Sequence, residues 1–469
     1  PDALHSLASW GYSANADELS SAGVYATLYG SVSMFIIGCS FHIIPKLAGT
    51  KLASETNANL VSFIWSVSVL IILIGSQNSI ILGIDIIPLG ILLNSVVLLA
   101  VIMNQLLTVS NRTRNIAMPG WLILIALLSS PILSIVSILS GALDDNVGQW
   151  LTYHISGGTF FFAGVAGIAL YSSSIASGNP LWSKTLVGVT LIGSIFTINP
   201  FGDVSGEMVI DLFGPLAGDK TISFTNQDML SASFLMALVS IPVLAFASNM
   251  LVTMRGSDMF VDAPDASGNA ELNLGSWLII PIAVGSLFVQ TDTVSGTYEL
   301  VGISNSLSAM AGWLVLVPLS LGASLSLYPE LVGRHLFSQS RARWAFWMMT
   351  GGAIFGLSIT MIADFMDMAL AESLVEDPSS LSEELRKVGS VMFYGVVIGS
   401  IFHSLNMVTG MFRGKIISQK PVTSSSISVE TYSLVSPMTV RRILASGADL
   451  DTEVIPTGEN DEKGRATKI

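Results

Sequence analysis

The feature that most constrains this chain is a series of long apolar runs that contain almost no charged residue. Each run has about 18 to 27 residues, the length that an α-helix needs to cross a hydrocarbon core of about 30 Å. Because a backbone in lipid must satisfy its own hydrogen bonds, such runs predict membrane-spanning helices. Eleven spans are predicted, near residues 24–45, 58–77, 86–108, 118–141, 149–173, 183–199, 229–253, 275–291, 299–326, 344–366 and 388–411.

The composition supports this interpretation and excludes several classes of protein. Only 11% of the residues are charged and 51% are apolar, whereas a soluble domain carries about 25% charged residues. The single cysteine, Cys39, excludes a disulfide framework, and we interpret it as a packing residue. The sequence shows no phosphate-binding loop, no nucleic-acid signature and no internal repeat. The predicted fold class is therefore an all-α membrane protein.

The distribution of lysine and arginine predicts how the helices are oriented, because cytoplasmic loops carry an excess of both. One set of loops holds eleven of these cations, Lys46, Lys51, Arg112, Arg114, Lys184, Arg255, Arg334, Arg341, Arg343, Arg413 and Lys415. The opposite set holds three, Lys220, Arg386 and Lys387, together with 20 Asp and Glu residues. The first set is predicted to face the cytoplasm of a bacterium, which places Pro1 outside and the C-terminus inside.

Three regions follow from this topology. Residues 1–23 are predicted to be an outer, periplasmic segment, and residues 24–412 are predicted to form the transmembrane bundle. Residues 413–469 are predicted to be a cytoplasmic tail. The tail is rich in serine and acidic residues and has no apolar period, which is typical of a largely disordered segment.

Four stretches carry a resemblance to a known family, and they occur in the family's order and spacing. They are Gly30–Gly49, Trp150–Tyr171, Leu300–Tyr328 and Leu327–Trp347, the last reading "LYPELVGRHLFSQSRARWAFW". Together they resemble subunit I of the C-type (cbb3-type) heme–copper oxidases. The resemblance covers residues 24–412 and implies a bundle of twelve helices. The first predicted span matches the family's second helix, so the first helix is expected before Pro1.

The resemblance also implies that the family's cofactor ligands are missing. The family uses six histidines to hold two hemes and one copper, because neutral imidazole binds both metals strongly. This chain has five histidines in total. The matching ligand positions are Gly23 and Leu307 for the low-spin heme, Asn305 for the high-spin heme, and Phe201 and Gly202 for copper.

Three of the remaining histidines lie in or near the predicted spans. His154 matches the one copper ligand that is left, and it is either a mononuclear metal site or, as we prefer, a histidine hydrogen-bonded near the outer surface. His42 is expected to place its polar tip among lipid headgroups. His403 is expected to bond within the bundle or to contribute to a heme site that uses other ligands.

Ionisable side chains inside the bilayer would mark a proton or ion path. The interiors of the predicted spans contain essentially none, since Glu299, Asp364 and Asp367 lie at outer ends. No carrier for proton pumping is therefore visible. The many small residues in the spans suit close helix packing, and a water-filled channel is the alternative.

The leading hypothesis is a non-catalytic relative of oxidase subunit I that serves as a structural subunit of a respiratory electron-transfer complex. Heme and copper are then expected in partner subunits, with none in this chain. One alternative is a divergent oxidase or nitric oxide reductase subunit with altered ligands. A transporter or quinone-binding membrane protein built on the same bundle is the other.

The acidic outer face suggests where a partner could dock. A field of this sign attracts a basic protein such as a c-type cytochrome and weakens as salt rises. Acidic outer loops that follow only from the membrane topology are the alternative. The residues predicted to contribute most are Asp144, Asp145, Glu376 and Asp377.

Overall fold

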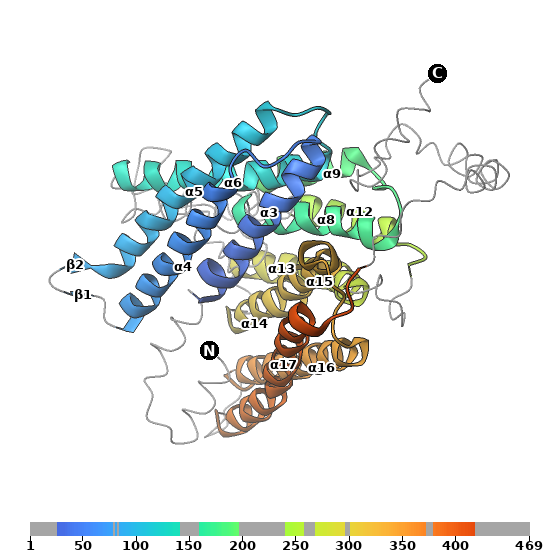
Figure 1. The fold of residues 1–469 in the computed structure, drawn as a ribbon. Helices are drawn as coiled ribbons and strands as arrows, with labels where there is room; N and C mark the ends of the chain where they lie inside the picture. The colour runs from blue at the N-terminus through green and yellow to red at the C-terminus, as the bar shows by residue number, and fades with distance from the viewer. Residues whose placement is uncertain are drawn as a thin grey trace.

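The computed structural model describes residues 26–77, 80–81, 84–140, 159–196, 240–257, 268–295, 301–371 and 379–417. Within these ranges the chain forms eleven helical rods, one for each predicted span (Figure 1). The rods are π-helix η1 (Ala26–Val32) continued by α3 (Ser33–Ala48), α4 (Glu55–Gln77), α5 (Ile86–Ser110), α6 (Met118–Ser140), α8 (Ala163–Ser177), α9 (Lys184–Phe196), α12 (Ser240–Thr253), α13 (Asn269–Ser295), α14 (Val301–Ala311) continued by π-helix η5 (Gly312–Leu316) and α15 (Val317–Val332), α16 (Gln339–Ala371) and α17 (Ser379–Arg413).

Helices account for nearly all of this structure, as the apolar runs predict. The described strands, β1 (Ile80–Ile81) and β2 (Ile84–Asp85), pair as a short antiparallel hairpin between α4 and α5. Seven helices within the described residues are long and apolar enough to cross a membrane. The chain is thus a multi-pass, all-α membrane protein.

An internal threefold repeat organises the bundle, and the sequence interpretation that found no repeat is wrong. In each unit a π-helical turn leads into an α-helix of 16, 15 or 16 residues, namely α3, α8 and α15. Each of these helices ends at a glycine in the left-handed region, with φ of 65° at Gly49, 66° at Gly178 and 69° at Gly333. Glycine adopts this conformation without a steric penalty, so it caps each helix and turns the chain.

The same polar clamp then fixes the start of the next helix in each unit. Five residues after the capping glycine comes a serine, Ser54, Ser183 or Ser338, directly before α4, α9 or α16. A buried asparagine from the third helix of the unit (α5, α12 or α17) accepts a hydrogen bond from that serine's backbone N–H and donates one to its carbonyl oxygen. The pairs are Asn104 with Ser54 (3.0 and 2.8 Å), Asn249 with Ser183 (3.2 and 2.8 Å) and Asn406 with Ser338 (2.9 and 2.9 Å).

A threonine one helical turn after the asparagine extends the clamp in two units. Thr108 accepts a hydrogen bond from the N–H of Ala53 at 3.0 Å, and Thr253 accepts one from Trp182 at 3.1 Å. In the third unit this position is Gly410, where a Cβ would lie 2.6 Å from the hydroxyl oxygen of Tyr328. The tyrosine fills the space that the threonine occupies in the other units.

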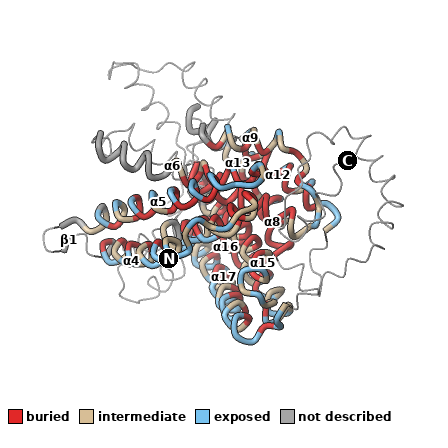
Figure 2. Tube along the Cα trace, turned by 45° about the horizontal axis from the view of Figure 1, so that its top comes forward, coloured by how far each residue is buried: buried red, intermediate tan, exposed pale blue. Residues whose placement is uncertain are grey.

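The first helices of the three units, α3, α8 and α15, pack against one another and form the centre of the bundle. Helix α6 packs on α8, and α13 packs on α15. The core follows this arrangement, because α8 is buried almost throughout, with Ile168, Leu170 and Tyr171 fully buried. Figure 2 shows buried residues concentrated where these helices meet.

Helices α16 and α17 form a tightly packed pair at one side of the bundle (Figure 1). Glycines bring their backbones together, and a Cβ added at Gly352 would lie 2.7 Å from the backbone nitrogen of Val396 and 2.9 Å from the Cα of Gly395. Small residues at such contacts drive helix association in membranes, where lipid is as apolar as the side chains. Their outward faces carry exposed apolar side chains such as Phe355 and Phe412, as expected for surfaces that meet lipid.

Candidate functional site

Most of the positions that the sequence marked as functional lie outside the described residues. This holds for Gly23, His154, Phe201 and Gly202, and also for Asp144, Asp145, Glu376 and Asp377. The predictions made for them stay predictions. Two ligand positions, Asn305 and Leu307, fall on α14, and for Asn305 only the backbone is described.

The Leu307 side chain is half-buried and packs against the protein core. Its two terminal methyl carbons lie 3.3 and 3.5 Å from the point that a Cβ on Gly285 of α13 would occupy. A leucine offers no lone pair to iron, and this one packs against the neighbouring helix. The residue at the position that the sequence resemblance matched to a low-spin heme ligand therefore has no group that could bind iron.

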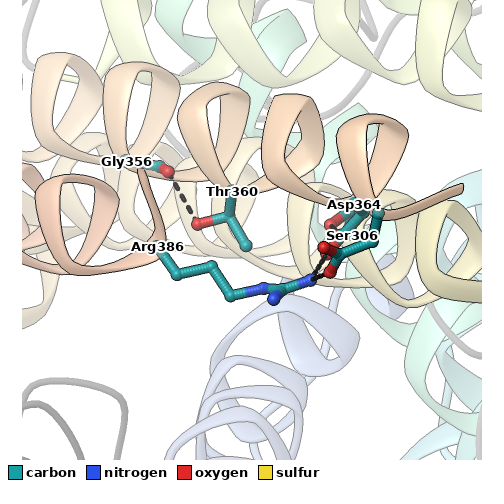
Figure 3. A network of polar contacts seen from close by, with 6 residues as sticks. Ser306, Gly356, Thr360, Asp364 and Arg386 are labelled. Carbon is teal, nitrogen blue, oxygen red and sulfur yellow. Dashed lines mark hydrogen bonds and ion pairs between the residues drawn. The ribbon is translucent and has the colours of Figure 1, made fainter. Parts of the chain in front are cut away.

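The residue between these two positions, Ser306, belongs to a polar network that joins three helices (Figure 3). Its hydroxyl donates to one carboxylate oxygen of Asp364 on α16. Arg386 on α17 donates to the other oxygen of Asp364 at 2.8 Å and to Asp367 at 2.5 Å. Ser306 is 5% exposed and the Asp364 side chain 12%, so the serine and one carboxylate are largely withdrawn from solvent.

This network is a structural tie between α14, α16 and α17 at the end of the bundle predicted to face outside. A buried carboxylate is expensive unless hydrogen bonds and an opposite charge satisfy it, and Asp364 has both. In the adjoining stretch, Trp313 of η5 packs edge-to-face on Phe393 of α17, with ring centroids 5.0 Å apart. The segment around positions 305 and 307 is therefore held by protein contacts on two sides.

The opposite end of the bundle has an ionic contact between α3 and α15. His42 Nε2 lies 3.1 Å from a carboxylate oxygen of Glu330, and Lys46 pairs with the other oxygen. The placement of His42 among lipid headgroups stays a prediction, and the structure adds that its imidazole lies against a carboxylate on the neighbouring central helix. This contact ties the first and third units of the repeat together.

A pocket between α13, η5, α15, α16 and α17 contains the ionisable groups that the sequence interpretation missed or misplaced. It is narrow, because the space inside it that a water-sized molecule can reach is about 20 Å³. Glu271 and His403 both line it, 8% and 6% exposed respectively. The expectation that His403 bonds within the bundle does not hold for its Nε2, which is buried and has no hydrogen-bond partner among the described residues.

Glu271 escaped notice because it precedes the predicted span 275–291 and resembles an ordinary acidic residue at a helix start. In the structure it lies in the first turn of α13, which packs on Gly322 in the middle of α15. Gly322 is ten residues from the end of α15 at Val332, a distance of about 15 Å along a helix. The carboxylate thus lies beside the interior of α15 and away from its end, and the apolar window "LGSWLII" that follows it in the sequence was the available signal.

No group of three or more His, Cys, Asp or Glu side chains that could hold a metal ion occurs in the part of the chain that the structure describes. Among the described residues, ionisable side chains gather in the Glu271–His403 pocket, in the Ser306–Asp364–Arg386 network and at the His42–Lys46–Glu330 contact.

Comparison with known proteins identifies the fold. No protein-family model and no curated protein matches the sequence. The structure is similar to a chain of a heme–copper terminal oxidase dimer determined by cryo-EM, with a TM-score of 0.60 and 12% sequence identity over 83% of this chain and 75% of that chain. The chain has a heme–copper oxidase fold. At this level of identity the similarity establishes the fold and leaves the chemistry to the residues of the site.

Proposed function

We propose that this chain is a non-catalytic subunit of a respiratory electron-transfer complex, built on the framework of cbb3-type oxidase subunit I. The observation that carries the proposal is the packing around positions 305 and 307. Leu307 packs on Gly285 and Ser306 is bonded to Asp364, so the turn expected to present heme ligands makes protein contacts instead. Heme and copper then belong to partner subunits.

The setting of the proposal follows from the distribution of charge. The cation-rich loops face the cytoplasm of a bacterial inner membrane, and the acid-rich segments face outside, where a c-type cytochrome would dock. The threefold repeat supports a structural role, because it fixes the arrangement of the helices without a cofactor. The polar clamps at Asn104, Asn249 and Asn406 depend on no cofactor.

The decisive experiment is a heme and copper assay on this chain after its separation from co-purifying subunits. We expect no Soret band and no stoichiometric copper with the isolated chain, and we expect both metals with the partner subunits. A Soret band that follows this chain through the separation would refute the proposal.

A ligand-restoring double variant provides a second test. Asn305→His combined with Leu307→His should not create oxygen consumption in the isolated chain, because metal sites need supporting groups as well as ligands. The positions matched to copper would still be Phe201 and Gly202. Measurable oxygen uptake by the double variant would contradict the proposal.

A further inference from the structure

The pocket between α13, η5, α15, α16 and α17 is narrow and carries polar side chains from three different helices. Glu271 comes from α13, Thr350 from α16 and His403 from α17. Trp313 and Phe346 are aromatic residues that line the same space. The space that a water-sized molecule can reach is about 20 Å³, and one buried water needs roughly 10–15 Å³. The pocket therefore has room for a group the size of a water molecule and no room for an organic ring.

His403 gives the first indication of a ligand. Buried polar atoms in proteins are hydrogen-bonded in the great majority of cases, and each exception requires an explanation. The imidazole lines the pocket, is 6% exposed, and leaves its Nε2 without a hydrogen-bond partner among the described residues. When the ring carries its proton on Nδ1, Nε2 is an acceptor. The pocket thus presents an unused acceptor to a group inside it.

Glu271 gives a second indication, from a different helix. The first turn of α13 packs against the middle of α15, where a Cβ on Gly322 would lie 2.8 Å from the backbone nitrogen of Leu272. The Glu271 side chain is buried beside this contact and lines the pocket. Within the described ranges, no lysine, arginine or histidine forms an ion pair with it. A buried carboxylate is costly without an opposite charge, so a cation in the pocket would stabilise it.

The lining restricts the chemistry of that cation. Among the described residues that line the pocket, Glu271 and His403 alone are of the types that usually bind a divalent metal ion, which is too few for calcium, magnesium or zinc. Sodium and potassium ions prefer oxygen ligands and would leave the nitrogen of His403 unused. A neutral water molecule could bond to His403 but would leave the charge of Glu271 uncompensated. The lining therefore favours a small cation that donates hydrogen bonds.

We propose that this pocket binds one ammonium ion. The ion is about the size of a water molecule, carries the charge opposite to that of Glu271, and has four N–H groups. One donates to the Glu271 carboxylate, one to His403 Nε2 and one to the hydroxyl oxygen of Thr350. The fourth lies toward Trp313 and Phe346, because aromatic rings attract cations. This inference does not depend on the proposed function, since finding heme in the chain would leave it untouched.

Isothermal titration calorimetry of the detergent-solubilised full chain tests the proposal. Ammonium chloride is titrated into a buffer that holds choline chloride at the same ionic strength, and we expect saturable binding of one ammonium ion per chain. Potassium should bind at least about tenfold more weakly, because it has no N–H to donate. Tetramethylammonium should not bind, because it is too large for the pocket. Equal affinity for ammonium and potassium would overturn the proposal, and so would the absence of saturable ammonium binding.

Matched variants test the polar contacts in the same titration. Glu271→Gln keeps the shape of the side chain but removes its negative charge, and His403→Phe keeps a ring but removes the acceptor. Each should weaken ammonium binding by about tenfold or more. The controls Glu383→Gln and His335→Phe change the same residue types outside the pocket and should bind ammonium as the unmutated chain does. Unchanged affinity in either pocket variant would refute the proposal.

A stability measurement keeps the test valid if a pocket variant folds poorly. Ammonium chloride should raise the thermal unfolding midpoint of the unmutated chain relative to choline chloride, because a ligand that binds only the folded state stabilises it. The midpoint of the Glu271→Gln chain should be the same in both salts, since it has no buried charge for ammonium to compensate. An unmutated chain that ammonium does not stabilise, or a variant that it stabilises equally, would contradict the proposal.

Discussion

The polar clamp at Asn406 gives the sharpest test of how this bundle is held together. The side chain is fully buried, donates to the carbonyl oxygen of Ser338 and accepts from its N–H, both at 2.9 Å. Ser338 in turn caps α16, with its hydroxyl oxygen 3.4 Å from the N–H of Arg341. Asn406→Ala removes both bonds to the segment that starts α16, so it should loosen that helix against α17.

The magnitude follows from the two bonds. Each net hydrogen bond contributes about 0.5–1.5 kcal/mol in soluble proteins, and side-chain bonds in a membrane bundle average about 0.6 kcal/mol. Ser338 is half-buried, so in the variant water can form some of the hydrogen bonds that its backbone N–H and carbonyl oxygen lose. We therefore expect Asn406→Ala to lower the free energy of unfolding by about 2 kcal/mol. Asn406→Asp keeps the shape but loses the donor, and it should also destabilise.

Reversible unfolding of the detergent-solubilised chain with increasing mole fractions of SDS, followed by circular dichroism, measures this difference. Asn111→Ala is the matched control, because Asn111 is exposed and its side chain donates to the carbonyl oxygen of Leu107 at the end of its own helix. The control should stay within about 0.5 kcal/mol of the unmutated chain. If Asn406→Ala and Asn111→Ala unfold alike, the clamp does not stabilise the bundle and the reasoning fails.

Three further predictions concern other parts of the structure. Arg386→Gln removes the ion pairs with Asp364 and Asp367 and should cost about 1 kcal/mol in the same unfolding assay, because the arginine is 42% exposed; an unchanged midpoint would contradict a structural role. Gly352→Ala forces a Cβ into the backbone of α17 and should cost about 1–3 kcal/mol, whereas Gly351→Ala, with nothing within 4 Å, is the control that should unfold normally. The four acids predicted to face outside are Asp144, Asp145, Glu376 and Asp377. Their neutralisation should slow association with a c-type cytochrome, measured by stopped flow, at low ionic strength and much less at high ionic strength. If the variant and the unmutated chain associate at the same rate under both conditions, these acids have no docking role.

The number and position of the helices could be predicted from the sequence because the membrane imposes one strong rule. A lipid-buried backbone must be helical over a fixed length, so apolar runs alone locate the rods. The ends were less accurate. Helices α16 and α17 run from Gln339 to Ala371 and from Ser379 to Arg413, beyond the apolar spans, because capping and polar contacts continue each helix outside the apolar layer.

The threefold repeat escaped prediction although its residues are legible in retrospect. The capping glycine and the serine enclose "GTKLAS" at 49–54, "GNPLWS" at 178–183 and "GRHLFS" at 333–338. Only the glycine, leucine and serine recur in all three, and the clamping asparagines follow 50, 66 and 68 residues after the serine. Three recurring residues with uneven spacing cannot be recognised as a repeat until the structure shows that they form the same clamp.

The polar site was harder to predict, for a physical reason. A carboxylate close to a predicted span end is ordinarily a solvated residue at a helix start, and the sequence of α13 gives Glu271 that appearance. Its depth depends on where α13 packs along α15, through the backbone contact of Gly268 with Gly322. Such a contact between distant segments cannot be read from a local pattern, so the pocket emerged only from the tertiary structure.

The repeat stabilises the bundle through residues that are separate from the positions matched to cofactor ligands in the sequence. The clamps use glycine conformation, serine backbone groups and asparagine amides at one end of the bundle, and none of these contacts involves position 305 or 307. Even within the clamps, Gly410 can replace the threonine because Tyr328 fills the space and bonds to Met407 at 2.7 Å. The clamps therefore hold the helices through residues other than those matched to cofactor ligands. Under the proposed function, the leucine at position 307 packs on Gly285 while these clamps stay intact.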